Sequence, residues 1–152
     1  MLHCNFNHNS VFFIGRNLDY AMGLEGSLKL KEISYIHSEG YASGELKHGA
    51  IALITQNTPV VALATQPAVF EKTLSNLKEV RARGAKTVLV CMDGTEPGAD
   101  AADHIIRIPP VPALLAPLEA IIPLQLFAYN MSVLRGCDVD KPRNLAKSVT
   151  VE

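Results

Sequence analysis

The sequence has almost no net charge, few cysteines and no long hydrophobic run. Its formal net charge at pH 7 is -1, so we expect no global electrostatic attraction to nucleic acid or to an anionic membrane surface. The cysteines at positions 4, 91 and 137 are odd in number and widely spaced, which excludes a disulfide framework and indicates reduced thiols. No run approaches the roughly 20 apolar residues of a membrane helix, and the start does not resemble a signal peptide. We therefore expect a cytoplasmic protein with no nucleic-acid or membrane partner.

A metal site also has little support in the sequence. His3, Cys4 and His8 lie close together, but a fourth ligand and a rigid frame are missing, and a disordered polar start over residues 1–10 is the favoured interpretation. The acidic residues of the segment TEPGADAADH lack any recognised spacing for metal coordination. We expect no metal and no other cofactor.

What the sequence does contain is enough apolar residues for one folded domain. Of its 152 residues, 48% are hydrophobic and 19% are charged, and a chain of this size buries roughly two thirds of its extended surface. Several short apolar runs are rich in β-branched residues, which is typical of strands buried on both faces of a parallel sheet. These runs cover residues 11–15, 50–54, 59–65, 87–93 and 104–109.

Helical patterns separate these runs, at residues 19–37, 67–83 and 113–135. The alternation of strands and helices predicts right-handed crossovers and an α/β fold, a three-layer α/β/α sandwich. In such sheets ligands bind at the carboxyl ends of strands, so the loop GRNLDY (residues 15–20) is one candidate wall of a site. That loop has no glycine-rich phosphate motif, so a nucleotide is not expected. On the third helix, five apolar residues at helical spacing are predicted to lie in the core: Leu114, Leu118, Ile122, Leu126 and Tyr129.

The first helix carries three charges on one stripe. Lys29 and Glu32 fall within about 40° of Glu25 when the helix is wound at 100° per residue. One interpretation is a solvated face with an ion pair. Apolar residues border the stripe, however, so a cavity lined by two carboxylates and an ammonium is favoured, and such a cavity is a candidate catalytic site. The opposite side of the helix is predicted to face solvent, and it collects Gly23, Ser27, Lys31 and Ser34.

Two more residues are candidates for chemistry. His48 lies in a glycine-bounded turn with Glu45 nearby, which suits a histidine that transfers protons at neutral pH. Lys147 follows two other cations in the polar tail, and neighbouring cations favour the neutral amine that attacks a carbonyl. A solvated basic tail and a structural histidine remain as the simpler alternatives. His37 is assigned no chemistry and is interpreted as a possible cation at the helix end.

Four segments resemble the C-terminal sugar isomerase (SIS) domain of the glucosamine-6-phosphate synthase family. They are LEGSLKLKEISYIHSEGYASGELKHG, EVRARG, PLQLFAY and DVDKPRNLAKSVTVE, and the similarity extends over almost the whole chain. The resemblance implies a five-stranded parallel sheet flanked by helices. It also implies an activity, the conversion of fructose 6-phosphate to glucosamine 6-phosphate, and a homodimeric assembly.

The resemblance implies a role for each candidate residue. Glu32 matches the carboxylate base that moves a proton between the first two sugar carbons, with Lys29 and the substrate-binding Glu25 beside it on the same helix. His48 matches the ring-opening histidine, which in this family comes from the neighbouring subunit. In the tail, Lys147 matches the lysine that forms a Schiff base with the open-chain ketose, and Ala146 a residue whose backbone touches the sugar.

The chain also departs from the full family pattern. Leu2 follows the first methionine where the family has the glutaminase nucleophile, and the phosphate-binding serines and threonines of the first SIS domain are absent. We therefore expect a SIS domain over residues 11–137 and a tail over residues 138–152 that lies across the active site. The missing glutaminase and first SIS domain would be partners in the full-length protein. The alternatives are a non-catalytic module that binds sugar phosphates and a unit that serves mainly for dimerisation.

Overall fold

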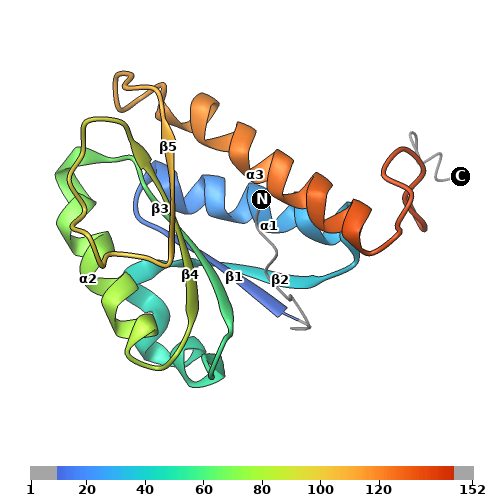
Figure 1. The fold of residues 1–152 in the computed structure, drawn as a ribbon, viewed down its shortest axis with the longest axis horizontal. Coiled ribbons are helices and arrows are strands. Elements are labelled where there is room, and N and C mark those ends of the chain that lie inside the picture. Colours follow the sequence, from blue (N-terminus) through green and yellow to red (C-terminus); the bar gives the residue numbers. More distant parts are fainter. Residues whose placement is uncertain (1–9, 146–152) are drawn as a thin grey trace, which may run out of the picture.

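The computed structural model describes residues 10–145, and they form a parallel β-sheet covered by helices on both faces (Figure 1). The strands are β1 (Ser10–Gly15), β2 (His37–Ala42), β3 (Pro59–Ala64), β4 (Lys86–Met92) and β5 (His104–Ile108). The α-helices are α1 (Leu18–Ser34), α2 (Phe70–Arg81) and α3 (Ala116–Leu134). Residues 10–145 also contain three short 3-10 helices: η1 (Ser43–His48), η2 (Ala50–Leu53) and η3 (Pro67–Val69).

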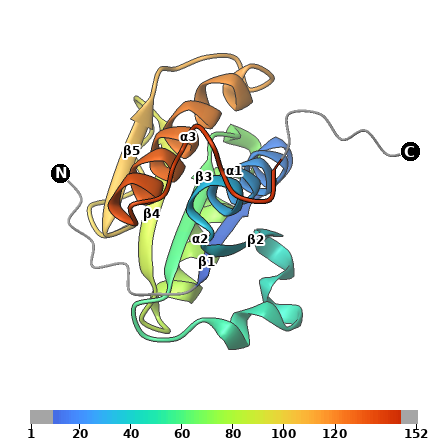
Figure 2. The same cartoon turned by 90° about the vertical axis from the view of Figure 1, so that its right-hand side faces the viewer.

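The sheet has five parallel strands in the order β2-β1-β3-β4-β5. Helices α1 and α3 lie side by side on one face, and α2 with the 3-10 helices covers the other (Figures 1 and 2). This architecture confirms the predicted three-layer α/β/α fold. Its layers decide which candidate residues can meet, because residues on opposite faces are separated by the sheet.

The central strands bury both of their faces, which explains their uninterrupted apolar sequences. In β1, Val11 and Phe13 belong to the core under α1 and α3, whereas Phe12 and Ile14 belong to the core under α2. This alternation is the two-residue period of a strand. The four apolar runs at residues 11–15, 59–65, 87–93 and 104–109 are thus confirmed as β1, β3, β4 and β5.

The fifth predicted strand, at residues 50–54, is wrong. These residues form η2, and the remaining strand is β2, whose sequence HSEGYA has no apolar run. The edge strand β2 pairs only with β1, so much of it stays near solvent and needs few apolar residues. A short apolar run cannot be assigned to a strand or a helix from its period alone.

The predicted solvent face of α1 is wrong for three of its four residues, whereas Lys31 is exposed as expected. Gly23, Ser27 and Ser34 are buried, whereas Leu24 and Leu28 are 44% and 42% exposed. Small residues face inward because α1 lies close to both the sheet and α3. Ser27 hydrogen-bonds the side chain of Ser38 in β2 at 3.0 Å, an approach that large side chains would prevent.

Helix α3 is apolar on two sides, and the side with large residues is exposed. Its buried side contains Ala116, Ala120, Leu124 and Ala128. The residues predicted to lie in the core are instead exposed by between 49% and 77%: Leu114, Leu118, Ile122, Leu126 and Tyr129. That prediction is wrong because helical spacing alone does not tell which of two apolar sides packs on the sheet. A helix with apolar residues all round usually has partners on both sides.

Candidate active site

The switch point of the sheet, where ligands of open α/β sheets usually bind, lies between β1 and β3. Its polar groups contact each other. Asp19, at the start of α1, is fully buried and accepts hydrogen bonds from the backbone nitrogen of Thr65 at 2.8 Å and from its hydroxyl at 2.5 Å. Burial raises the pKa of Asp19, and the hydrogen bonds from Thr65 oppose that rise in part. Arg16, in the same loop, donates to the side chain of Asn76 at 2.9 Å.

The loop predicted as a wall of the site is therefore occupied by internal contacts. A pocket of about 360 Å³ does open at the carboxyl ends of β3 and β4, but none of the residues lining it comes from residues 15–20. Its charged lining residues are Glu71 and Glu96, and two carboxylates would repel the phosphate of a sugar phosphate. This pocket does not suit such a ligand.

The charged stripe predicted on α1 is present as an ion-paired row. The Lys29 ammonium lies 2.7 Å from a carboxylate oxygen of Glu32 and 3.6 Å from one of Glu25. The side chains of Glu25, Lys29 and Glu32 are 39%, 32% and 29% exposed. The row is thus ion-paired and partly exposed, and none of its residues lines the pocket at the ends of β3 and β4. Its catalytic role stays a prediction.

The pairing favours the charged form of Lys29. Its hydrogen bond with Glu32 is the largest cause that raises the pKa of Lys29 above its ordinary value, and Glu25 adds to the rise. The pairing thus favours the cationic form that an ordinary lysine already has at neutral pH. A cation held 2.7 Å from a carboxylate can stabilise a negative oxygen that forms when that carboxylate removes a proton from a neighbouring carbon.

His48 lies on the other side of the sheet from this row. It is the last residue of η1, whose Leu46 packs in the core beneath α2, whereas Leu30 of α1 packs in the core beneath α3. The His48 side chain is 74% exposed, and its Nε2 lies 3.7 Å from a Glu45 oxygen, within ion-pair range but beyond a hydrogen bond. A single chain does not bring His48 to Glu32.

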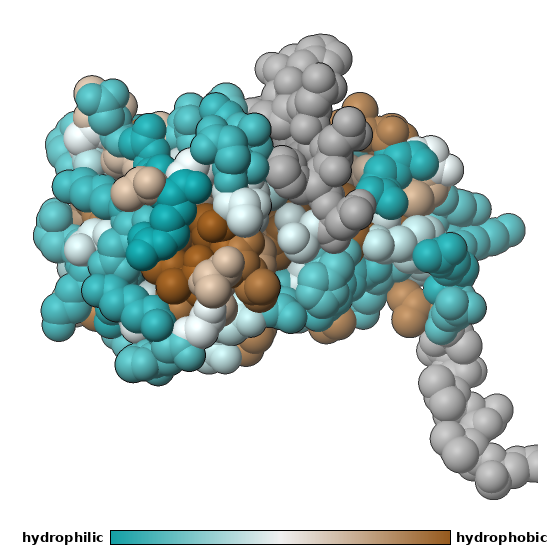
Figure 3. Space-filling view, turned by 90° about the horizontal axis from the view of Figure 1, so that it is seen from below, coloured by the Kyte–Doolittle hydropathy of each residue, from teal (hydrophilic) through white to brown (hydrophobic). Residues whose placement is uncertain are grey.

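The surface near His48 includes exposed apolar groups. Leu53, in the adjoining η2, is 59% exposed. The molecule seen from below carries a hydrophobic patch surrounded by hydrophilic residues (Figure 3).

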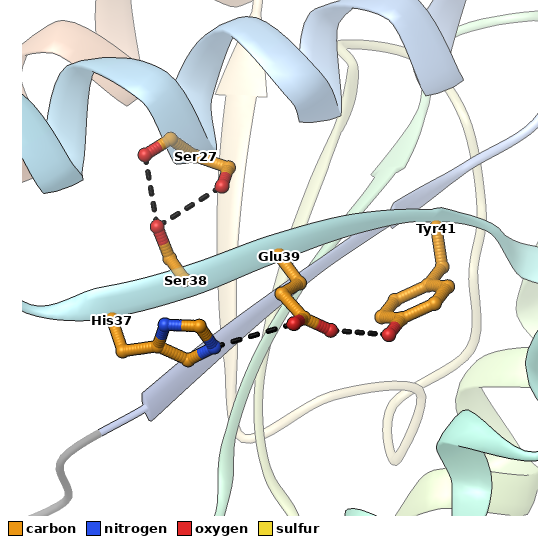
Figure 4. Close-up of polar contacts among 5 residues, drawn as sticks. All are labelled: Ser27, His37, Ser38, Glu39 and Tyr41. Carbon is orange, nitrogen blue, oxygen red and sulfur yellow. Dashed lines mark hydrogen bonds and ion pairs between the residues drawn. The ribbon is translucent and has the colours of Figure 1, made fainter.

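Strand β2 carries a polar row that the sequence interpretation missed. Glu39 accepts a short hydrogen bond from the Tyr41 hydroxyl and lies 3.3 Å from the His37 ring (Figure 4). The hydrogen bond with Tyr41 lowers the pKa of Glu39 and raises that of Tyr41. His37 is thus a strand residue and not the helix-end cation that was considered. The signal for this row was its two-residue spacing, which places alternate side chains on one face of a strand.

Ala146 and Lys147 lie outside the described residues, and so do His3, Cys4 and His8. The described part of the tail contacts the end of α1, where the backbone nitrogen of Arg143 donates to the Tyr35 hydroxyl at 2.8 Å. Between residues 10 and 145 no cluster of side chains could hold a metal ion. No helix in that same range is long and apolar enough to cross a membrane.

Comparisons with known proteins identify the family. The SIS domain model matches residues 6–135. The chain belongs to the SIS family. This SIS chain is 61% identical over 142 residues to the glutamine–fructose-6-phosphate aminotransferase [isomerizing] of Clostridium tetani, a match that covers 93% of the chain and 23% of that relative. A relative of the same name from Sphingobium yanoikuyae is 54% identical, with 93% of this chain and 92% of the relative covered.

A solved structure agrees with these relatives. The C-terminal domain of glucosamine-fructose-6-phosphate aminotransferase from Francisella tularensis superposes with a TM-score of 0.83 at 42% identity, over 89% of this SIS chain and 38% of that chain. These matches confirm the resemblance stated from the sequence. The SIS chain spans about a quarter of the length of several curated relatives that it matches, including those of Clostridium tetani and Symbiobacterium thermophilum.

Proposed function

We propose that this SIS chain is the isomerase part of a glutamine–fructose-6-phosphate aminotransferase and converts fructose 6-phosphate to glucosamine 6-phosphate. The observation that carries the proposal is the Glu25–Lys29–Glu32 row. It lies on α1 with side chains 29% to 39% exposed, in a chain 61% identical to a relative of that name. A carboxylate beside a fixed cation suits proton transfer next to a carbonyl or imine carbon.

The proposed reaction assigns a step to each residue. The neutral amine of Lys147 attacks the carbonyl carbon of the open-chain ketose, and loss of water gives a Schiff base. Ammonia then displaces the lysine amine. Glu32 removes a proton from the first sugar carbon and returns it to the second, while Lys29 stabilises negative charge on the neighbouring oxygen. Glu25 holds Lys29 and contacts substrate, and the backbone of Ala146 contacts the sugar.

We propose further that the active form is a homodimer. His48, the proposed ring-opening acid and base, lies across the sheet from Glu32, so it would reach the α1 row of a second subunit instead of its own. The exposed apolar residues of α3 and the patch in Figure 3 support the existence of covering partners. A glutaminase domain that supplies ammonia, and a first SIS domain that holds the phosphate, are the proposed partners within the full-length protein.

The internal contacts at the switch point support this division of work. Asp19 already occupies the hydrogen-bond donors of Thr65, and the pocket nearby carries two glutamates. A phosphate must therefore be held by groups from elsewhere. The same contacts weigh against the alternative function, a module that binds sugar phosphates by itself.

The test is covalent trapping of the Schiff base. The protein is incubated with fructose 6-phosphate and sodium borohydride, and added mass is located by peptide mass spectrometry. We expect a hexitol phosphate adduct on Lys147, while the Lys147→Arg variant serves as the matched control and gains no adduct. Unmodified Lys147 in the full-length protein, under conditions in which it makes glucosamine 6-phosphate, would contradict the proposal.

A further inference from the structure

The end of α1 is held by three contacts from the last turn of α3 and the segment that follows it. The Ser132 hydroxyl donates to the backbone oxygen of Ile33 at 2.8 Å. The Cys137 sulfur lies 3.9 Å from the backbone oxygen of Ser34. The third contact is the hydrogen bond to the Tyr35 hydroxyl from the backbone nitrogen of residue 143. The contacts thus fall on the last two residues of α1 and on its C-cap Tyr35, and the contact with Tyr35 comes from the tail.

Tyr35 makes a second contact with the same tail residue. The Arg143 guanidinium lies 4.2 Å from the centre of the Tyr35 ring, which is the geometry of a cation–π interaction. One tyrosine therefore binds both the backbone and the side chain of Arg143. No such double attachment is needed to end a helix.

The backbone conformation of Tyr35 indicates that its side chain has a role that glycine could not fill. Tyr35 is the C-cap of α1 and has a left-handed conformation, with φ 60° and ψ 17°. Glycine adopts this conformation most easily and is the commonest residue where a helix ends in this way. A tyrosine at such a position retains an aromatic ring and a hydroxyl that glycine would lack, and here both contact Arg143.

The position of this contact relates it to the proposed active site. Glu32 precedes Tyr35 by three residues, about 4.5 Å along the helix axis. Lys147 follows Arg143 by four residues, which span at most about 14 Å of extended chain. Fixing Arg143 on Tyr35 thus limits how far Lys147 can move from the carboxylate and ammonium on α1.

We propose that Tyr35 and Arg143 form a clasp that positions the tail, so that Lys147 stays within reach of the Glu32–Lys29 pair. This inference rests on the proposed function for the role of Lys147, but not for the clasp itself. Tyr35 and Arg143 are positioning residues, because they act on the substrate through Lys147. Loss of the clasp should slow attack by Lys147 more than it weakens the binding of fructose 6-phosphate, to which the tail contributes only the backbone of Ala146.

The first experiment measures the clasp without substrate. Trypsin can cut after Arg143 and after Lys147, whereas Lys141 is protected by the proline that follows it. In the Tyr35→Gly variant, which loses the ring but fits the left-handed backbone, we expect cleavage after Arg143 to become about tenfold faster than in the wild type. Tyr20→Phe, on the same helix, is the control and should leave that rate unchanged. An unchanged rate in Tyr35→Gly would overturn the clasp.

The second experiment measures positioning, by borohydride trapping of Lys147 in the full-length protein at a series of fructose 6-phosphate concentrations. In Tyr35→Gly we expect the maximal trapping rate to fall about tenfold, and the half-saturating concentration to rise by a smaller factor, because only the backbone contact of Ala146 with the sugar is weakened. Tyr35→Phe, which keeps the ring, should recover part of the rate. Equal maximal rates in the wild type and Tyr35→Gly would overturn the positioning role and leave the proposed function intact. Failure to trap Lys147 in the wild type would instead contradict the proposed function, and the trypsin rates would still decide the clasp.

Discussion

Asp19 shows how a single buried residue decides what the switch point can bind. Its carboxylate accepts hydrogen bonds from both the backbone nitrogen and the hydroxyl of Thr65. These donors follow β3, where a parallel sheet would otherwise present them to an anionic ligand. The carboxylate of the chain itself takes the place of that anion. The phosphate grip is therefore expected to come from a different domain.

Replacing this carboxylate should destabilise the fold in a pH-dependent way. Asp19→Asn keeps one acceptor oxygen, so one of the two Thr65 donors loses its partner, and we expect the free energy of unfolding to fall by about 1–3 kcal/mol. Because burial raises the folded pKa of Asp19, the stability of the wild type increases as pH falls through that raised value towards 3.8. The difference in the free energy of unfolding between the wild type and Asp19→Asn should thus increase as the pH is lowered.

Urea unfolding of both proteins at several pH values between neutral and acid measures this difference. Thr65→Val, which removes only the hydroxyl, is the matched control for the loss of a single hydrogen bond. A difference in the free energy of unfolding that stays constant, or that decreases as the pH is lowered, would show that Asp19 does not titrate with a raised pKa.

At the scale of elements, α1 has two functions on two sides. Its inner side carries small residues that let it pack closely on β1 and α3, and a Cβ added at Gly26 would lie 2.8 Å from a Leu124 methyl carbon. Its outer side carries the Glu25–Lys29–Glu32 row with Leu24 and Leu28 beside it. Close packing of the inner side holds the charged row in place, because a helix that cannot shift keeps its outer side chains fixed relative to the sheet.

A side chain at Gly26 should therefore disturb the contact between α1 and α3. The added atoms of Gly26→Val meet Leu124 on one side and Phe13, 3.1 Å from the new Cβ, on the other. We expect a loss of about 1–3 kcal/mol in the free energy of unfolding, measured by urea denaturation. Ser75→Ala, at an exposed position of α2, is the control and should stay within about 0.5 kcal/mol of the wild type. Equal stability of Gly26→Val and the wild type would show that the two helices are not tightly packed there.

At the scale of the whole molecule, the sheet separates the two proposed proton-transfer residues. Glu32 lies on α1, whose core is shared with α3, and His48 ends η1, whose core is shared with α2. The proposed site that contains both residues would therefore be shared between two subunits. Figures 1 and 2 show the two layers on opposite sides of the strands.

Subunit complementation tests this arrangement. Full-length protein carrying Glu32→Gln is co-expressed with protein carrying His48→Ala, each inactive by itself. A mixed dimer has one site with both residues intact if His48 acts on the neighbouring subunit, so random pairing should restore about a quarter of the wild-type rate of glucosamine 6-phosphate formation. Both sites of the mixed dimer stay defective if His48 acts within its own chain, and no recovery would contradict the dimeric site.

The sequence by itself determined the fold class and most of the sheet. The runs that became β1, β3 and β4 are recognisable because strands buried on both faces must be apolar throughout. The edge strand β5 was also recognised, from the isoleucines of HIIRI. The sequence also brought Glu25, Lys29 and Glu32 onto one stripe of α1, because the helical period is a local property. The assignments of Glu32, Lys29, His48 and Lys147 to chemical steps came from the resemblance and stay predictions.

Only the tertiary structure decided which sides of the elements are covered. The edge strand β2 was not predicted, and the strand expected at residues 50–54 is the 3-10 helix η2, because burial depends on position in the sheet and not on composition alone. The inner side of α1 and the exposed side of α3 were predicted wrongly. Closely packed helices bury small residues, whereas a helical-wheel analysis assigns small residues to the solvent face. The contacts Asp19–Thr65 and Tyr35–Arg143 join residues far apart in the chain. No local pattern could predict them, since such pairs exist only once the layers have assembled.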